Sequence, residues 1–138
     1  MKSSPIILVD DDQEDCEFVQ LAMEELKIKN KLIVFHKSAE VLEYLKNMPV
    51  RPFFILCDVN MPMMSGLELK EKIDADKVLC ERAVPFLFLS TSIQQNLVNK
   101  AFLLRIHGFL KKPSSLEGYK TILTAAMNYW EISAYPQV

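Results

Sequence analysis

The sequence predicts an α/β fold in which helices cover both faces of a parallel sheet. Two kinds of segment support this fold class. Short apolar runs, typical of strands buried on both sides, alternate along the chain with longer segments in which apolar residues recur every three or four positions. The longer segments have the pattern of amphipathic helices. Strict alternation of strands and helices favours parallel pairing with helices on both faces of the sheet.

Five strands are expected, each an apolar run that stops at polar residues: Pro5–Val9, Leu32–Phe35, Phe53–Cys57, Ala83–Leu89 and Ile106–Leu110. Right-handed crossovers leave few arrangements of five such strands. We expect the flavodoxin-like order 2-1-3-4-5 of a doubly wound (βα)5 sheet. A single domain is predicted over residues 1–138, with its core at about residues 5–130 and no output domain.

Five helices with an apolar stripe are expected: from about Asp12 to Ile28, a short helix capped by Ser38 and ended by Pro49 and Pro52, Leu67–Leu79, Ile93–Arg105, and Leu116–Trp130. Either Asp11 or Asp12 is a suitable cap for the first of these helices, because a short acidic side chain accepts from free backbone N–H groups.

Composition excludes several classes of protein. The net charge of −2 gives no general attraction to nucleic acid or membrane surfaces, and no apolar run approaches the roughly 20 residues of a membrane span. The first residues read as a strand rather than a signal peptide. The cysteines, Cys16, Cys57 and Cys80, are odd in number and widely spaced, so neither disulfides nor a zinc site are expected. A reducing cytoplasm is the expected location.

Polar side chains follow four of the predicted strands at the same end of the sheet: Asp10 and Asp11, Asp58, Ser90 and Thr91, and Lys112. Each has an ordinary interpretation when taken alone. Asp58 would be a turn or cap residue, and Lys112 a solvated loop lysine. Four unrelated loops would rarely place this complementary set at corresponding strand ends, so we expect a site there.

The charges indicate what this site holds. Two carboxylates about 5 Å apart repel by roughly 3 kcal/mol at an effective dielectric constant near 20, so three of them favour a bound cation. Oxygen ligands from Asp11, Asp58 and a backbone carbonyl suit Mg²⁺. With the Lys112 ammonium and the Ser90 hydroxyl, the set is suited to hold a phosphoryl group in line with a carboxylate nucleophile.

These residues, with Met61-Pro62, Met64-Ser65-Gly66 and Lys112-Pro113, resemble the receiver domain of two-component response regulators, of the stand-alone CheY-like kind. The resemblance covers about residues 5–130. It implies a signalling protein of a phosphorelay that catalyses only its own phosphoryl transfer and dephosphorylation. Asp58 would accept the phosphoryl group from a histidine kinase or phosphotransfer protein.

The resemblance also implies roles for the other site residues. Asp11 and the backbone carbonyl of Asn60 would bind Mg²⁺ together with Asp58, and Asp10 would act through a metal-bound water. Lys112 would bind a phosphoryl oxygen, and the Lys112–Pro113 peptide would be cis.

Ser90 would move toward the phosphoryl group, and Phe109 would then swing inward as a switch. Phe109 lacks the hydroxyl of the tyrosine that many members have, and Thr91 is bulkier than the usual alanine. Asn60 and Ser92 stand where the family tunes dephosphorylation. The connection Asp74–Ala83 is longer than is typical.

The signal is expected to leave by protein contact, because the few residues after Trp130 are too short for an output domain. Possible partners are a downstream protein or a second copy bound through the face of the last helix. Candidate contact residues there are Tyr119, Tyr129, Trp130 and Tyr135, although Tyr119 and Trp130 are more readily interpreted as core residues. Asn128-Tyr129-Trp130 resembles the small receivers that partner phytochrome-type kinases.

Three alternatives remain. A haloacid-dehalogenase-like phosphatase also has an Asp nucleophile, but needs a second acid where Asn60 stands, and its other acids come late in the chain. In a flavodoxin-like flavin binder, the acids at residues 10–12 would repel the phosphate group of the flavin. A receiver used only as an interaction module would need no phosphoryl group, although the acceptor set is intact.

Overall fold

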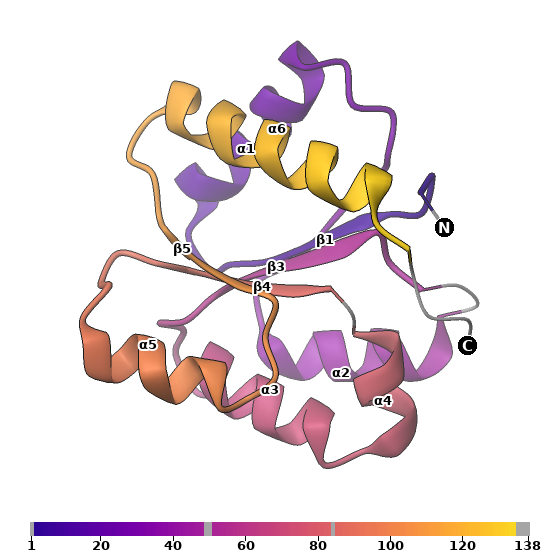
Figure 1. Ribbon diagram of the computed structural model, residues 1–138, viewed down its shortest axis with the longest axis vertical. Coiled ribbons are helices and arrows are strands. Elements are labelled where there is room, and N and C mark those ends of the chain that lie inside the picture. Colours follow the sequence, from indigo (N-terminus) through magenta and orange to yellow (C-terminus); the bar gives the residue numbers. More distant parts are fainter. Residues whose placement is uncertain (1, 49–50, 84, 135–138) are drawn as a thin grey trace.

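The computed structural model describes residues 2–48, 51–83 and 85–134. In this part of the chain, one parallel sheet has the strand order β2-β1-β3-β4-β5, as predicted (Figure 1). The strands are β1 (Ile6–Val9), β2 (Leu32–Phe35), β3 (Phe54–Asp58), β4 (Phe86–Ser90) and β5 (Gly108–Lys111). The order reverses between β1 and β3, which is where open α/β sheets hold their ligands.

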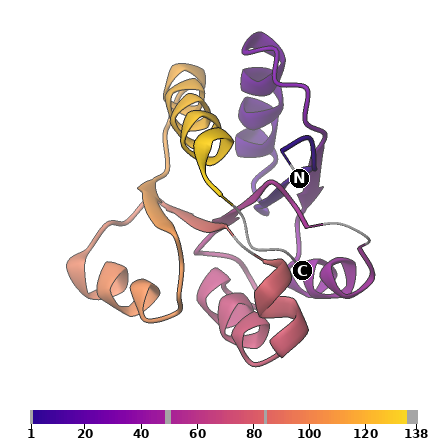
Figure 2. The same cartoon turned by 45° about the vertical axis from the view of Figure 1, so that its right-hand side comes forward.

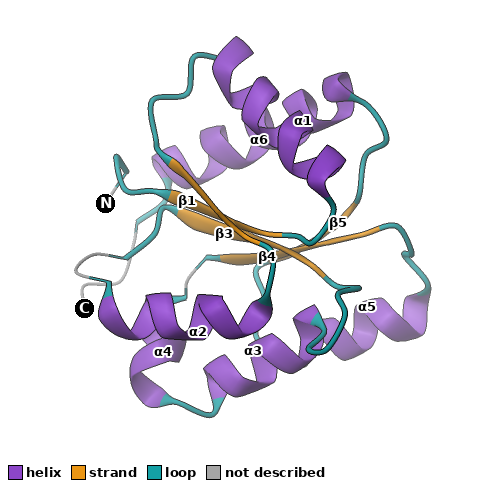
Figure 3. Cartoon of the chain, turned by 180° about the vertical axis from the view of Figure 1, so that it is seen from behind, coloured by secondary structure: helices purple, strands orange, loops and turns teal. Residues whose placement is uncertain are grey.

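Helices cover both faces of the sheet, as Figures 1 and 3 show from opposite sides. One face carries α1 (Gln13–Glu25) and α6 (Leu116–Ile132), which lie side by side in Figure 2. The other face carries α2 (Ser38–Asn47), α3 (Gly66–Asp74), α4 (Lys77–Arg82) and α5 (Gln95–Phe102).

The three central strands are buried on both sides, and their residues alternate between two cores. Ile7, Ile55 and Phe88 belong to the core under α2–α5. Their neighbours Leu8 and Leu56 belong to the core under α1 and α6. Because successive side chains of a strand point to opposite faces, an unbroken apolar run is what a sheet covered on both sides requires.

The helix expected over Leu67–Leu79 is wrong as a single element. Helix α3 ends at Asp74, and a separate helix, α4, begins at Lys77 with Asp76 as its N-cap. The Asp76 carboxylate accepts from the backbone N–H groups of Val78 and Leu79, at 2.9 and 3.1 Å. A short acidic side chain that bonds to the backbone ahead of it favours a new helix start over continuation.

The prediction that Ser38 caps the second helix is also wrong. The helix begins at Ser38 itself, and Lys37, at the N-cap position, makes no side-chain cap hydrogen bond. The Ser38 hydroxyl donates instead to the carbonyl of Met64, at 3.0 Å. It therefore ties the start of α2 to the loop after β3, a contact between distant parts of the chain that local pattern does not reveal.

Smaller differences concern element ends. Strand β4 begins at Phe86 rather than Ala83, which is the C-cap of α4. Strand β5 begins at Gly108, and α5 is shorter at both ends than expected. Pro49 and Tyr135, to which the sequence assigned roles, lie outside the described residues. Among the described helices, none has the length and apolar character needed to cross a membrane.

Candidate functional site

The strand register brings the predicted polar residues to one edge of the sheet. Val9 pairs with Cys57, so Asp10 leaves β1 beside Asp58, the last residue of β3. Strand β4 ends alongside at Ser90, whose carbonyl accepts from the backbone N–H of Lys112 at 2.7 Å. The pairing of the apolar strands thus assembles side chains from four strand ends.

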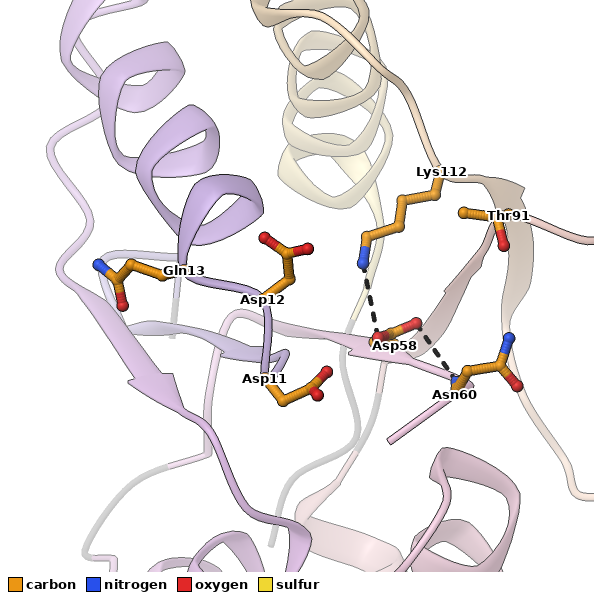
Figure 4. A pocket seen from close by; sticks show the side chains of 7 residues that line it. All are labelled: Asp11, Asp12, Gln13, Asp58, Asn60, Thr91 and Lys112. Carbon is orange, nitrogen blue, oxygen red and sulfur yellow. Dashed lines mark hydrogen bonds and ion pairs between the residues drawn. The ribbon is translucent and has the colours of Figure 1, made fainter. Parts of the chain in front are cut away.

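Three carboxylates form a cluster at this edge. Oxygen atoms of Asp10, Asp11 and Asp58 all lie within 4.8 Å of one another. Asp10 is fully buried and Asp58 is 5% exposed, whereas Asp11 is exposed. A pocket of about 560 Å³ opens beside them. Its lining residues are drawn in Figure 4: Asp11, Asp12, Gln13, Asp58, Asn60, Thr91 and Lys112.

The Lys112 ammonium lies inside the acidic cluster. Its Nζ is 2.9 Å from Asp10 Oδ2, 2.8 Å from Asp15 Oδ2 and 3.5 Å from Asp58 Oδ2. The lysine side chain is only 8% exposed. One buried cation is thus shared among carboxylates from β1, α1 and β3, so the cluster keeps an excess of negative charge.

Burial and this excess of negative charge shift the pKa values of the acids. Burial, followed by the charge of Asp10, raises the pKa of Asp58 to about 6. Burial also raises the pKa of Asp10 above its usual value. Burial by itself would lower the pKa of Lys112, but its bonds to Asp15 and Asp10 outweigh burial and raise that pKa. The lysine therefore stays charged. Its single positive charge does not balance the negative charges of the two buried acids, Asp10 and Asp58.

Backbone groups orient the acids. Asp10 Oδ1 accepts from the N–H of Asp12 at 2.9 Å, and Asp58 Oδ1 accepts from the N–H of Asn60 at 3.3 Å. Asp12, rather than Asp11, is the N-cap of α1, and its carboxylate accepts from the N–H groups of the first turn. Asp11 is thereby left to face the pocket (Figure 4).

The loop after Asp58 is tightly folded. The N–H of Gly66 donates to the carbonyl of Val59 at 2.9 Å, and a Cβ on Gly66 would lie 2.4 Å from the carbonyl oxygen of Asp58. Ser65 and Glu68 then start α3 with a capping box. Only a residue without a side chain fits this close approach, so Gly66 fixes the loop against the acid.

The predicted hydroxyl donor does not line the pocket. Ser90 is fully buried, and its Oγ accepts from the N–H of Ser92 at 3.1 Å. Thr91 lines the pocket instead. Phe109 is half-buried and contacts Phe88 edge to face, with ring centroids 6.2 Å apart.

Asp15 belongs to this network, and sequence reasoning missed it. It lies on the first turn of α1, among charged residues that read as a solvated helix face. The available signal was its place on the first turn of the helix that directly follows the acids at residues 10–12. Tyr119 is a core residue, the interpretation that the sequence favoured over a surface contact, because it is fully buried and its hydroxyl donates to Asp15 Oδ1 at 3.0 Å.

The donor set suits a divalent cation. Three carboxylates with oxygens this close offer hard ligands, and the single lysine leaves them with net negative charge. Mg²⁺ prefers such oxygen ligands and keeps several waters, which an open pocket allows. The set has no thiolate or imidazole of the kind that zinc favours.

Comparison with known proteins decides the family. The response regulator receiver domain matches residues 6–124 of the chain. The chain belongs to this family. Receiver domains are signalling modules rather than conventional enzymes, which sets aside the phosphatase and flavin-binding alternatives.

Individual relatives agree with this receiver assignment. Response regulator Rcp1 of Synechocystis sp. is 26% identical over 131 residues, covering 91% of this chain and 87% of the relative. The probable methanogenesis regulatory protein FilR2 of Methanothrix harundinacea is 26% identical over 129 residues, covering 91% and 82%.

Solved structures show the same receiver fold. The phosphorylated cyanobacterial phytochrome response regulator RcpA superposes with a TM-score of 0.83 at 24% identity, over 96% of this chain and 98% of that one. The Mn²⁺-bound form of Rcp1 gives 0.80 at 25% identity, over 96% and 98%. The resemblance to small receivers of the phytochrome group is thereby confirmed.

Proposed function

We propose that this receiver domain accepts a phosphoryl group on Asp58 from a histidine kinase or phosphotransfer protein and signals by protein contact. The observation that carries the proposal is the position of Asp58. It ends a buried strand, lies at the edge of a polar pocket, and has both a lysine ammonium and two further carboxylates beside it. A structural acid at a turn needs neither the second buried carboxylate nor the buried lysine.

In the proposed reaction an Asp58 oxygen forms a bond to phosphorus as the bond from phosphorus to the donor's imidazole nitrogen breaks. The released imidazole takes a proton. Lys112, 3.5 Å from Asp58, stabilises negative charge on the phosphoryl oxygens. Hydrolysis of the aspartyl phosphate returns the free carboxylate, so the chain catalyses only its own phosphorylation and dephosphorylation.

We propose Mg²⁺ as the cofactor, held by Asp11, Asp58 and the backbone carbonyl of Asn60, with Asp10 acting through a water. When bound, the ion neutralises charge between the attacking carboxylate and the phosphoryl oxygens. The close oxygens of the three acids support this assignment. The structure of the related Rcp1 with Mn²⁺ is in keeping with a divalent cation in this family.

Ser90 and Phe109 are the proposed switch. Ser90 would turn its hydroxyl from the Ser92 N–H toward the phosphoryl group, which leaves room for Phe109 to move inward past Phe88. Because Phe109 has no hydroxyl, packing alone would distinguish its two positions. The cis Lys112–Pro113 peptide remains a prediction of the family resemblance.

The proposed exit for the signal is the surface of α5 and α6. Exposed apolar side chains there include Phe102, the last residue of α5, and its C-cap Leu103, 51% and 83% exposed, and Tyr129 on α6, 60% exposed. A downstream protein or a second copy of the chain would bind this surface. A phytochrome-type kinase in the cytoplasm is the proposed donor, since RcpA, which shares the fold, is named as a phytochrome response regulator.

The proposal is tested by intact-mass spectrometry after incubation with acetyl phosphate, with and without Mg²⁺. We expect a single phosphoryl adduct that requires Mg²⁺ and is lost in Asp58→Asn. The matched control is Asp76→Asn, which removes a carboxylate from the N-cap of α4 but leaves a residue that caps equally well. No adduct with acetyl phosphate or a phosphorylated kinase would contradict the proposal and favour a phosphorylation-independent interaction module.

A further inference from the structure

The three carboxylates around Lys112 hold it unequally. Asp10 and Asp15 approach its Nζ to 2.9 and 2.8 Å, whereas Asp58 lies at 3.5 Å. All three contacts are ion pairs to one ammonium group, whose three N–H donors these carboxylates share. The contact with Asp15 holds the lysine toward α1, whereas Asp10 lies beside Asp58 at the neighbouring strand end.

Asp15 also connects this lysine to α6. Its Oδ2 contacts Lys112, and its Oδ1 accepts from the hydroxyl of Tyr119 at 3.0 Å. Tyr119 is fully buried and stacks on Phe18 of α1, with ring centroids 5.9 Å apart. A buried tyrosine hydroxyl needs a partner, and the carboxylate that satisfies it is the one that holds the lysine.

We propose that Asp15 is a positioning residue that competes with the phosphoryl group for Lys112, and that Tyr119 sets the strength of this competition. The inference rests on the proposed function. A phosphoryl group on Asp58 presents oxygens that attract the ammonium, which must shorten its longest contact to meet them. The contact that must then lengthen is the one with Asp15, because Asp10 stays adjacent to Asp58 at the neighbouring strand end.

The hydroxyl of Tyr119 weakens the hold of Asp15 on the lysine. A donor on one carboxylate oxygen draws negative charge toward itself and leaves less on the oxygen that faces Lys112. Removal of the hydroxyl should therefore tighten the Asp15–Lys112 contact, whereas removal of the Asp15 charge should release the lysine. Two neighbouring substitutions are thus expected to act in opposite directions.

The test measures the affinity for beryllium fluoride, a phosphoryl mimic, by calorimetry at saturating Mg²⁺. We expect Asp15→Asn to tighten binding by about fivefold, the low end of typical coupling between sites. We expect Tyr119→Phe to weaken it by about threefold, as befits one hydrogen bond. In the Asp15→Asn background, Tyr119→Phe should change nothing, since the carboxylate through which it acts is gone.

The matched control is Glu14→Gln, which removes one negative charge from the same helical turn at an exposed position. It should leave the affinity within twofold of the wild-type value, because exposed charges are screened. Unfolding free energies of all variants separate packing from positioning. A purely structural role would lower stability in both variants and could not give opposite changes in affinity.

The outcomes are distinguishable. If the wild-type chain binds no beryllium fluoride, the proposed function fails and this inference fails with it. If the wild-type chain binds but Asp15→Asn is no tighter than Glu14→Gln, the inference alone is overturned. Equal effects of Tyr119→Phe in the presence and absence of the Asp15 carboxylate would also overturn it.

Discussion

Asp58 is a buried acid with too little positive charge around it. Its side chain is 7% exposed, and the nearest ammonium, on Lys112, has two closer carboxylate partners. The raised pKa of about 6 expresses the cost of keeping this carboxylate ionised beside Asp10. A protein that only needed a stable fold would gain from a neutral residue here, and the retained charge fits the proposed role of Asp58 as phosphoacceptor.

Asp58→Asn should therefore stabilise the metal-free protein. In the unfolded chain the carboxyl ionises near pH 3.8, and in the folded chain near pH 6, so the folded state holds the proton more tightly. Above pH 6 the charged side chain costs stability, and the variant should gain roughly 2 kcal/mol in unfolding free energy, measured by urea denaturation.

The raised pKa of Asp58 also fixes how the stability difference between the variant and the wild type changes with pH. As the pH falls from 6 toward 4, the wild-type carboxyl takes up its proton in the folded state, and the advantage of the variant should fade. Added Mg²⁺ should also reduce it. Asp11→Asn, which removes an exposed acid of the same cluster, should gain less. An Asp58→Asn protein less stable than the wild type at pH 8 would contradict this account.

At the same scale, the sequence located the acids and the lysine but not their connections. Asp10, Asp11, Asp58 and Lys112 could be placed because each follows an apolar strand. Asp15 could not, because it lies on a helix and its role depends on which way the Lys112 side chain turns. Ser90 was expected to line the pocket, yet its hydroxyl bonds to a local N–H group that periodicity does not reveal.

At the scale of elements, the connection between β3 and α3 determines the geometry of the site. Asp58 ends the strand, Gly66 starts the helix, and the N–H of Gly66 returns to the carbonyl of Val59. Met63 in this loop has φ of 69° and is 99% exposed. The left-handed conformation costs energy for a residue with a side chain, so the closure of the loop must compensate.

Gly66→Ala tests this closure. The added Cβ would lie 2.4 Å from the Asp58 carbonyl oxygen and 3.1 Å from Val59 Cα, both backbone atoms that cannot move cheaply. We expect a loss of about 2–3 kcal/mol in unfolding free energy, measured by urea denaturation, because overpacking strains the backbone. Ser65→Ala, the neighbouring control, should cost about 1 kcal/mol through the lost cap. Equal stability of Gly66→Ala and the wild type would show that the loop accommodates the added methyl group without strain.

The break between α3 and α4 shows where prediction from pattern fails at this scale. Ala75 and Asp76 are both tolerated inside helices, and the apolar spacing continues past them. The Asp76 carboxylate bonds to the backbone ahead of it, and the separate helix that follows buries Leu79 in the core. Core burial and a local cap together outweighed helical periodicity.

At the scale of the whole molecule, the sheet order could be predicted because it follows from alternation and handedness. What binds the outer surface could not, since exposed apolar residues carry no local signature. Phe102 and Leu103 lie at the C-terminal end of α5, and Tyr129 lies on α6, at the proposed exit for the signal.

Light scattering tests whether a second copy binds there. With Mg²⁺ and beryllium fluoride we expect the mass of the wild-type protein to double, since a shift of Phe109 would change the α5–α6 surface. Tyr129→Lys, which places a charge on that surface, should remain monomeric, and Asp58→Asn should not respond. An unchanged wild-type mass would remove dimerisation as an output and leave a downstream protein as the partner.

The pairing of Val9 with Cys57 has one more consequence. Asp10 and Asp58 are far apart in the chain and become neighbours only when β1 and β3 pair in this register. A slip by one residue would turn the side chains of the slipped strand toward the opposite faces and would carry Asp10 away from Asp58, so the acids would no longer meet. The acceptor site therefore forms only when the two strands pair correctly. A misfolded or partly folded copy has no acceptor site and cannot send a false signal.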